Sequence, residues 1–305
     1  MSASVPFETP AKAGPPAGRM PAAQMFLLIA GVLVGTGSLG ALGTSLPLPW
    51  APAGMALGAA MILLGAVGLG RAITPGAPLE SDRTGDPSSM PAQLTGQLDP
   101  VLSRWKWLVK WFLAIPHYAV LAVLWVAFLV VTVAAGVAIL VTGRYPAALF
   151  QFAVGVLRWN WRVSFYAYGV LGTDEYPPFT LARTAYPAEF DVAYPASLSH
   201  WKVLVKSWLL ALPQLLVVSA LSGGAWASSS ASGISLMGVL VLVAAVILLC
   251  TGVYRVGLFN LLMGINRWVL RTVTYVALLT DTYPPFRLDQ GPFDPPAGAL
   301  EPGSA

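Results

Sequence analysis

The sequence predicts an all-α integral membrane protein with about six transmembrane helices, and three observations predict this fold class. Hydrophobic residues make up 56% of the 305 residues and charged residues only 10%, whereas a soluble domain is typically about 25% charged. Apolar runs of about 20 residues, the length that crosses a bilayer, recur along the chain. Residues 91–181 and 187–288 are two copies of one unit, each with a Tyr-Pro-Pro-Phe motif near its end. We therefore expect a hairpin followed by two repeats of two spans, with interfacial helices and short surface strands.

The N-terminal part of the chain precedes the repeats. Residues 1–24 are rich in Pro, Ala and Gly and are expected to form a disordered tail. Met25–Leu46 and Gly54–Ile73 are apolar, and their many Gly and Ala residues allow two helices to approach closely in lipid. A signal peptide is disfavoured, because the first apolar run is too long for one and a second run follows at once. We expect residues 25–73 to form a transmembrane hairpin and residues 74–90 a polar linker.

Each repeat starts with a short segment in which polar and apolar residues alternate. In the second copy Phe190 and Val192 point one way while Glu189 and Asp191 point the other, which is the period of a strand. Residues 94–98 show the same alternation more weakly in the first copy. We expect two short strands that pair with each other at the membrane surface.

A basic and aromatic segment follows each predicted strand. Lys106 and Lys110 are four residues apart, which places them on one face of a helix. The second copy repeats the segment at a constant offset of 96 residues. Lysines and tryptophans at the edge of an apolar run favour an interfacial anchor. The predicted anchor residues are Trp105, Lys106, Lys110, Trp201, Lys202 and Lys206.

Two apolar helices complete each repeat after Pro116 and Pro213, and each proline is expected to kink the chain. In the second copy a Ser, Gly and Ala-rich insertion at residues 222–233 interrupts the first of these helices. Residues 289–305 are expected to form a disordered C-terminal tail. The predicted spans are His117–Val141 and Pro146–Leu171 in the first copy and Ile234–Val253 and Arg255–Thr280 in the second.

Two topologies are compatible with this pattern. In the first, Trp105–Ile115 lies in the interface and each repeat crosses the membrane twice; in the second, Trp105–Val141 forms a tight hairpin and each repeat crosses three times. The second would place equivalent lysines on opposite sides of the membrane, against the positive-inside bias, and its tip at Leu124–Val126 contains no turn residue. The position of the insertion is easier to explain by the hairpin. We favour two crossings per repeat, with both termini in the cytoplasm.

The strongest functional signal is a polar face on the last helix of each repeat. In both copies a Gln or Asn, two Arg and a Tyr recur at spacings of seven, four and four residues, which places them on one helical face. An arginine inside a membrane span costs several kcal/mol or more, so four of them require negative charge or water. The predicted site residues are Gln151, Arg158, Arg162 and Tyr166 in the first copy and Asn260, Arg267, Arg271 and Tyr275 in the second.

Several sources of that negative charge are open at this stage. Anionic lipid headgroups, an acidic substrate, helix C-terminal carbonyls, or the loop residues Asp174, Glu175 and Asp281 would each serve. Three interpretations follow: the arginines snorkel to the headgroups, they form an internal polar cluster that holds the repeats together, or they form a ligand or lipid site.

Other residues give little indication of chemistry. His117 aligns with Gln214, which neither titrates nor readily binds a metal, so such a role used by both copies is excluded, and an interfacial hydrogen-bonding role is favoured over a proton relay. Cys250 is the only cysteine, so one chain cannot build a Cys-based metal or redox site. Phosphate-binding, dinucleotide, zinc-protease and nucleophile-elbow motifs are absent from the sequence. We expect no enzymatic activity, catalytic residue, metal, cofactor or nucleic-acid partner.

Three segments of the first repeat, Thr142–Pro146, Gly155–Trp159 and Thr173–Phe179, carry a resemblance to a known family. They are similar to the bacterial membrane family called domain of unknown function 4389, which is common in actinobacteria, and the similarity spans both repeats. The second copy departs from the pattern at Gln214 and at residues 253–256. The resemblance implies a membrane protein and brings no activity with it.

These observations favour a non-enzymatic, multi-pass protein of the plasma membrane. Its expected role is that of a scaffold or accessory subunit of a membrane complex, in which the arginine helices contact anionic lipids, a partner membrane protein or a second copy. The alternative is a carrier or binding protein for an anionic lipid-like solute, with the paired arginines as its headgroup site.

Overall fold

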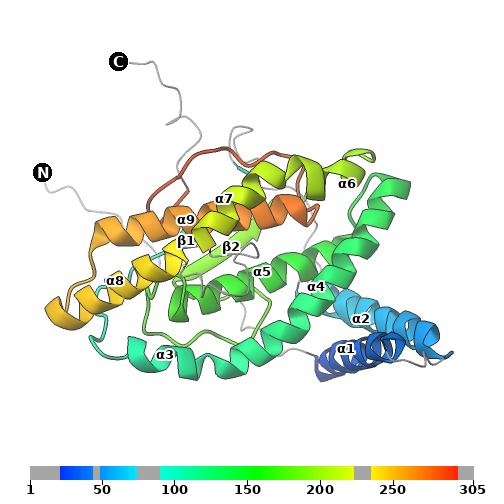
Figure 1. The fold of residues 1–305 in the computed structure, drawn as a ribbon, viewed down its shortest axis with the longest axis horizontal. Coiled ribbons are helices and arrows are strands. Elements are labelled where there is room, and N and C mark those ends of the chain that lie inside the picture. The colour runs from blue at the N-terminus through cyan, green and yellow to red at the C-terminus, as the bar shows by residue number, and fades with distance from the viewer. Residues whose placement is uncertain (1–20, 44–48, 74–89, 223–234, 295–305) are drawn as a thin grey trace, which may run out of the picture.

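The part of the chain that the structure describes is mainly helical, with one small antiparallel sheet near its centre (Figure 1). This confirms the predicted helical class in its coarser form. The predicted N-terminal tail, the linker after the hairpin and the inserted loop lie largely outside the described residues. A computed structural model describes residues 21–43, 49–73, 90–222 and 235–294.

Three helices among the described residues are long and apolar enough to cross a membrane: α1 (Ala22–Leu42), α2 (Ala51–Ile73) and α4 (Ile115–Thr142). In the second repeat α7 (Leu212–Ser222) and α8 (Leu236–Thr251) are apolar but shorter. The last helices of the repeats, which carry the arginines, are not among these candidates. The six predicted spans are therefore not confirmed.

The helices α1 and α2 pack closely against each other as a hairpin. A Cβ atom at Gly58 would lie 2.8 Å from the carbonyl oxygen of Gly31 and 2.7 Å from the amide nitrogen of Gly35. Glycine thus lets the two backbones approach in the way expected of small residues in membrane helices. The hairpin is joined to the first repeat, because α2 packs against α4 and against α5 (Ala147–Ala167).

The start of the first repeat argues against a tight hairpin at this position. The short helix α3 (Trp107–Leu113) ends at Ala114, and α4 then runs without a break through Leu124–Val126, where the hairpin would need its tip. Pro116 lies in the first turn of α4, where its missing N–H removes no helical hydrogen bond. The chain does break next to Pro116, at Ala114 between α3 and α4, so the proline begins a new helix and does not bend a continuous one.

The second repeat has one extra residue ahead of its proline, and the chain accommodates it in a π-helix, η1 (Lys206–Leu210). The amide of Ala211 donates to the carbonyl oxygen of Lys206, five residues back, at 3.0 Å. The equivalent amide of Ala114 donates to Lys110, four residues back, at 2.9 Å. A π turn absorbs one added residue locally, so the lysine before it and the helix after it keep their places.

The arginine helices α5 and α9 (Val256–Val276) form the middle of the molecule. The strand β1 (Ala92–Gly96) packs on α9, and β2 (Ala188–Val192) packs on α5. The helix α4 also packs on α5, and α7 and α8 pack on α9. Each repeat therefore contributes one helix to the middle layer. The helix α5 packs against the strand that begins the second repeat, and α9 packs against the strand that begins the first.

Two tryptophans show that the sheet and α4 cover opposite faces of α5. The indole of Trp161 donates to the carbonyl oxygen of Thr95 in β1 at 3.0 Å, and the indole of Trp159 donates to His117 in α4 at 3.0 Å. Residues two apart on a helix point in nearly opposite directions. The layers are thus the sheet, then α5 and α9, then α4 with α7 and α8.

The two strands pair in an antiparallel ladder, as the alternation predicted. Leu94 pairs with Phe190 at the centre of the ladder, and these two positions are equivalent in the two copies. The flanking pairs also map onto each other when the copies are exchanged. A pseudo-two-fold axis therefore passes through the middle of the sheet, and the two repeats run in opposite directions.

Contacts at the ends of α5 follow the same pseudo-two-fold axis. Gly143 ends α4 with a φ of 68°, and a Cβ there would lie 2.8 Å from Nε2 of His200. Gly252 ends α8 with a φ of 73° and lies against the guanidinium of Arg104, the residue equivalent to His200. The basic segments of the two copies, the second of which contains α6 (Lys202–Val205), therefore lie at opposite ends of α5.

The predicted disordered C-terminal tail is wrong for its first residues. The amide of Gly96 donates to the carbonyl oxygen of Pro292 at 2.9 Å, and the amide of Leu94 donates to Oδ2 of Asp294 at 2.6 Å. Residues 289–294 therefore lie along the free edge of β1. Their composition is typical of a disordered tail, but the carboxylates of Asp289 and Asp294 form ion pairs with buried Arg271.

Candidate functional site

The arginines of the first repeat lie near the middle of α5, a helix whose side chains are almost all buried. Arg158 is 1% exposed and Arg162 is 0% exposed. A charged group is very costly to bury unless it is paired and hydrogen-bonded. The strand β2 meets that requirement, because it packs on α5 and carries Glu189 and Asp191.

These side chains form what we call the first arginine cluster. Nε of Arg158 lies 2.6 Å from Oε1 of Glu189, and Nη2 of Arg162 lies 2.8 Å from Oε2 of the same carboxylate. Nη2 of Arg158 also lies 3.0 Å from Oδ1 of Asp191, which pairs in addition with the exposed Arg183. Glu189 thus bridges the two buried guanidinium groups, and the cluster holds three positive and two negative side chains.

The second arginine cluster has the same charges with different acids. Nη1 of Arg271 lies 2.6 Å from Oδ2 of Asp289, and Nη2 lies 2.6 Å from Oδ1 of Asp294. Nε of Arg267 lies 3.0 Å from Oδ1 of Asp294. Arg287, which is partly exposed, pairs with Asp289 at 3.0 Å. The carboxylates come from the C-terminal segment, because the second copy is followed by no further strand among the described residues.

Backbone contacts join each cluster to the strand across the pseudo-two-fold axis. Nε of Arg158 donates to the carbonyl oxygen of Phe190 at 3.0 Å, and Nη2 of Arg267 donates to that of Leu94 at 3.1 Å. The two arginines are equivalent residues, and so are the two carbonyls at the centre of the ladder. The arrangement is that of an internal polar cluster that holds the repeats together.

The source of negative charge differs from the loop acids considered from the sequence. Asp174 and Asp281 bind lysines, and Glu175 is exposed. The alternation of β2 indicates that Glu189 and Asp191 point away from the core, yet both side chains reach α5. Alternation sets the direction of the Cβ atom and does not limit how far a long side chain extends. All four guanidinium groups are buried, so they do not snorkel to the molecular surface.

The other four predicted site residues do not join the arginine clusters. Gln151 is half-buried, one turn into α5. The side-chain oxygen of Asn260 is buried and has no hydrogen-bond partner among the described residues. Tyr166 and Tyr275 lie at the far ends of their helices, where each faces a buried lysine.

The buried lysine of the first repeat is held by three groups, one of which is itself hydrogen-bonded to the backbone. Lys110 is 2% exposed, and its Nζ lies 2.8 Å from Oδ1 of Asp174 and donates to the carbonyl oxygen of Thr173 at 2.8 Å. The ammonium group also lies 5.3 Å from the ring centroid of Tyr166. The other oxygen of Asp174 accepts the amide of Ser103 at 2.8 Å.

The second repeat reproduces this site group for group. Lys206 is 1% exposed, lies 2.9 Å from Oδ1 of Asp281 and donates to the carbonyl oxygen of Thr280. Its Nζ lies 4.6 Å from the ring centroid of Tyr275, and the amide of Ser199 donates to Oδ2 of Asp281 at 2.8 Å. The equal geometry shows that the π-helix η1 preserves the position of this lysine despite the added residue.

The prediction of an interfacial anchor is wrong for Lys110 and Lys206, because both are buried. Trp105 and Trp201 are 58% and 63% exposed, in keeping with a place at the surface of the molecule. The side chain of Lys106 is 48% exposed, and Lys202 is half-buried. The spacing of four residues predicts a shared helical face, but it does not predict which lysine of each pair is buried against a carboxylate.

Burial and ion pairing shift the pKa values of these groups in opposite senses. Burial lowers the pKa of Lys110 and of Lys206, and the hydrogen bonds of Asp174 and Asp281 oppose that shift. Burial by itself would raise the pKa of Asp174, but the hydrogen bonds from Lys110 and Ser103 outweigh it and hold that pKa below its usual value.

His117 and Gln214 have the same structural role in the two copies. Nδ1 of His117 accepts the indole N–H of Trp159 at 3.0 Å, and Oε1 of Gln214 accepts that of Trp268 at 2.6 Å. The amide of Gln214 also donates to the carbonyl oxygen of Pro284 at 2.8 Å. Both side chains are buried, so the predicted hydrogen-bonding residue lies in the interior and not at an interface. Their partners Trp159 and Trp268 are not among the site residues predicted from the sequence.

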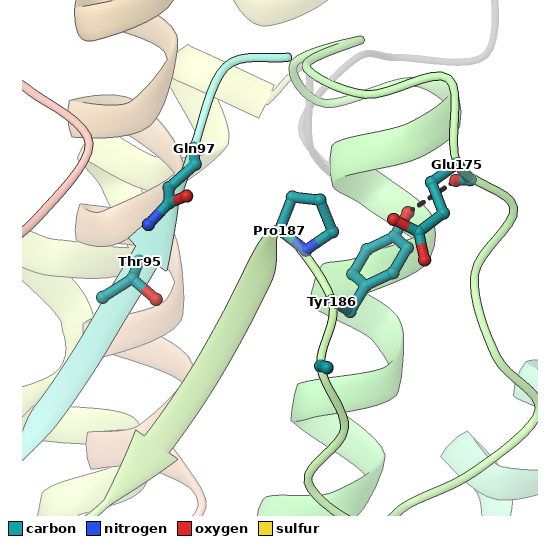
Figure 2. A pocket seen from close by; sticks show the side chains of 6 residues that line it. Thr95, Gln97, Glu175, Tyr186 and Pro187 are labelled. Carbon is teal, nitrogen blue, oxygen red and sulfur yellow. Dashed lines mark hydrogen bonds between the residues drawn. The ribbon is translucent and has the colours of Figure 1, made fainter. Parts of the chain in front are cut away.

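A polar hollow of about 390 Å³ opens beside the sheet, where the first repeat connects to the second (Figure 2). The hydroxyl of Tyr186 donates to the carbonyl oxygen of Glu175 at 3.0 Å across one wall. The sequence could not indicate this hollow, because its walls come from the start and the end of the first repeat and from the connection to the second. Across the described ranges, no group of three or more His, Cys, Asp or Glu residues is placed to hold a metal ion. The hollow is lined by Thr95, Gln97, Glu175, Ala185, Tyr186 and Pro187.

Comparison with known proteins places the repeats in a family. The family described as domain of unknown function (DUF4389) matches residues 104–180 and residues 202–287, one match in each repeat. The two matches together cover just over half of the chain. No curated protein and no solved structure matches the chain. The resemblance noted in the sequence is therefore confirmed in two tandem copies, and the chain belongs to the DUF4389 family.

Proposed function

We propose that this protein is a non-enzymatic integral protein of the plasma membrane that serves as a scaffold or accessory subunit of a membrane complex. The observation that carries the proposal is that the chain itself neutralises its four buried arginines. Arg158 and Arg162 share Glu189, and Arg267 and Arg271 share Asp294. These charges bind the two repeats into one framework and are not left open to a ligand.

The surface of the described residues supports a place in the membrane. Apolar side chains are exposed along α1, α2, α4 and α8, for example Phe26 at 69%, Leu64 at 64% and Val133 at 70%. Such surfaces meet lipid acyl chains, another membrane protein or a second copy of this chain. Arg144 and Arg255 are exposed at the turns before α5 and α9, and the positive-inside bias favours a cytoplasmic side for them and for both termini.

A carrier for an anionic lipid-like solute is the less supported function. A headgroup would have to replace the carboxylates that already bind the buried arginines. Breaking a buried ion pair by removing one partner costs about 3–5 kcal/mol. Arg183 and Arg287 are the more exposed arginines of the two clusters, with side chains 55% and 32% exposed, so they are the groups that a headgroup would reach first.

The test compares what stays bound after purification in mild detergent. A variant with Arg183→Gln and Arg287→Gln removes the accessible cations, and a variant with Arg158→Gln and Arg267→Gln removes buried ones. The scaffold role predicts a stoichiometric protein partner, seen by native mass spectrometry, that is kept by the first variant, whereas the second unfolds at lower temperature. Stoichiometric anionic lipid that the first variant loses, with its unfolding midpoint unchanged, would support the carrier instead.

A further inference from the structure

The two outer layers of the repeat body differ sharply in polarity. On α4 and α8 the outward residues are apolar, and on α4 they recur every four residues, so they form a stripe along the helix. Exposure reaches 62% at Leu129 and 70% at Val133 on α4, and 56% at Leu242 on α8. These helices lie on the side of α5 and α9 that is opposite to the sheet.

The face of the sheet is polar instead. Gln97 is exposed, and Glu189 and Asp191 have side chains 28% and 21% exposed. Arg183 is 55% exposed beside them. The hollow in Figure 2 opens on this side, next to Thr95 and Gln97. One side of the body therefore suits hydrocarbon, and the other suits water.

An orientation in which α5 crosses the bilayer conflicts with this distribution of charge. Arg158 and Arg162 lie near the middle of α5, so their partners would lie at the depth of the bilayer centre. Glu189, Asp191 and Arg183 would then expose charge at that depth. Charged groups within the hydrocarbon are rare and costly unless protein or a water-filled cavity surrounds them.

The path of the chain gives a second argument against crossing. Residues 168–198 lead from the C-terminal end of α5 back to its N-terminal end. There the amide of Leu198 donates to the carbonyl oxygen of Gly143. This stretch contains β2 and no helix. If α5 crossed the membrane, an extended segment would have to cross back, and lipid does not accept such a segment unless protein or water covers it.

The hairpin is better suited than the repeats to cross a membrane. Both of its helices are long and apolar enough to cross a membrane, and they bury a smaller share of their apolar stretch than α4 does. The C-terminal end of α2 lies against the start of α5, where a Cβ at Gly70 would meet the backbone of Ala148. Trp50 lies at the other end of α2, so the tip of the hairpin is the part of it farthest along α2 from this contact.

From these observations we infer that the tandem repeats lie along one face of the bilayer. The outward residues of α4 and α8 rest in the acyl chains of one leaflet, α5 and α9 form the next layer, and the sheet with its hollow faces the water. Among the described helices, only α1 and α2 cross the membrane. This inference rests on the membrane location proposed above, and it replaces crossings by the repeats with partial insertion.

Cysteine accessibility in membranes tests the orientation. The full-length Cys250→Ser chain is the parent, and single cysteines replace Arg144 and Arg255 at opposite ends of α5, Gln97 on the polar face, or Trp50 at the tip of the hairpin. A membrane-impermeant maleimide is applied to right-side-out spheroplasts and to inverted vesicles. We expect the first three positions to react from one side only and the Trp50→Cys position to react from the other.

Each remaining result has a definite meaning. Reaction of the Arg144→Cys and Arg255→Cys chains from opposite sides shows that α5 crosses and overturns the inference. Protection of the Gln97→Cys chain from both sides until detergent is added overturns it too. Reaction of the Trp50→Cys chain from the same side as the rest overturns the crossing of the hairpin. If a variant has a lower unfolding midpoint than the parent, Thr142→Cys and Thr251→Cys, at exposed and equivalent positions at the ends of α4 and α8, replace the two end positions. Recovery of the parent chain in the soluble fraction contradicts the membrane location itself.

Discussion

At the scale of single residues, the two copies keep one hydrogen bond to a tryptophan but use different residues to accept it. An indole N–H of Trp159 or Trp268 is buried in each repeat and needs an acceptor. His117 supplies a ring nitrogen, and Gln214 supplies an amide oxygen. The histidine leaves its Nε2 buried without a hydrogen-bond partner among the described residues, whereas the glutamine also satisfies a carbonyl of the Tyr-Pro-Pro-Phe segment.

Replacement of one acceptor residue by the other tests this interpretation. We expect His117→Gln to keep the unfolding free energy within about 1 kcal/mol, because an amide at this position accepts the indole of Trp159 in the way that Gln214 does. His117→Leu leaves the indole N–H without an acceptor and should cost about 1–3 kcal/mol. Thermal unfolding in detergent measures both. Equal losses for the two variants would show that ring packing, and not the acceptor, is what matters.

At the scale of elements, the sequence indicates more about where helices lie than about what surrounds them. Apolar runs locate α1, α2 and α4 to within a few residues, since lipid-facing helices need long apolar stretches. The same reasoning assigns α5 to the lipid, although its neighbours bury it almost completely. Periodicity identifies a polar face, but the carboxylates that meet it lie up to 33 residues away along the chain.

The π-helix η1 gives a test at the element scale. Deletion of Leu209 should be tolerated, with an unfolding midpoint close to that of the parent, because it restores the spacing by which the first repeat places both Lys110 and His117. Deletion of Phe112, which is similarly exposed, should be strongly destabilising, because the chain has no extra residue there and His117 rotates away from Trp159 by one helical position, about 100°.

Thermal unfolding and the yield of folded protein compare the two deletions. A larger loss for the Leu209 deletion than for the Phe112 deletion would show that η1 is required in its own right and does not simply absorb one residue.

On the scale of the whole molecule, the pseudo-two-fold axis explains why charges can be buried in the centre. Each arginine cluster is completed across the axis, through Phe190 for Arg158 and through Leu94 for Arg267. The equivalent contacts of His200 and Arg104 with Gly143 and Gly252 close the two ends. A first repeat alone leaves Arg158 and Arg162 without Glu189, and a second repeat alone leaves Arg267 without the carbonyl of Leu94, so the tandem copies depend on each other.

We therefore expect the stability of the folded protein to depend on the C-terminal segment. The double substitution Asp289→Asn and Asp294→Asn removes both carboxylates of the second arginine cluster and leaves Arg267 and Arg271 buried without a counter-charge. We expect a loss of at least about 3 kcal/mol of unfolding free energy, measured by thermal unfolding in detergent. Glu175→Gln, which changes an exposed acid, should stay within about 0.5 kcal/mol. A double variant as stable as this control would mean that the cluster does not hold the repeats together.

The helical class, the duplication, the pairing of the two strands and the identity of the four arginines can be predicted from the sequence. Those features depend on composition, spacing and repetition, which are local properties of the chain. The folded molecule is needed to see which acids neutralise the arginines, that Lys110 and Lys206 are buried, and that the two copies run in opposite directions. Each of these depends on the pseudo-two-fold axis, which brings together residues whose separation in the sequence carries no periodic mark.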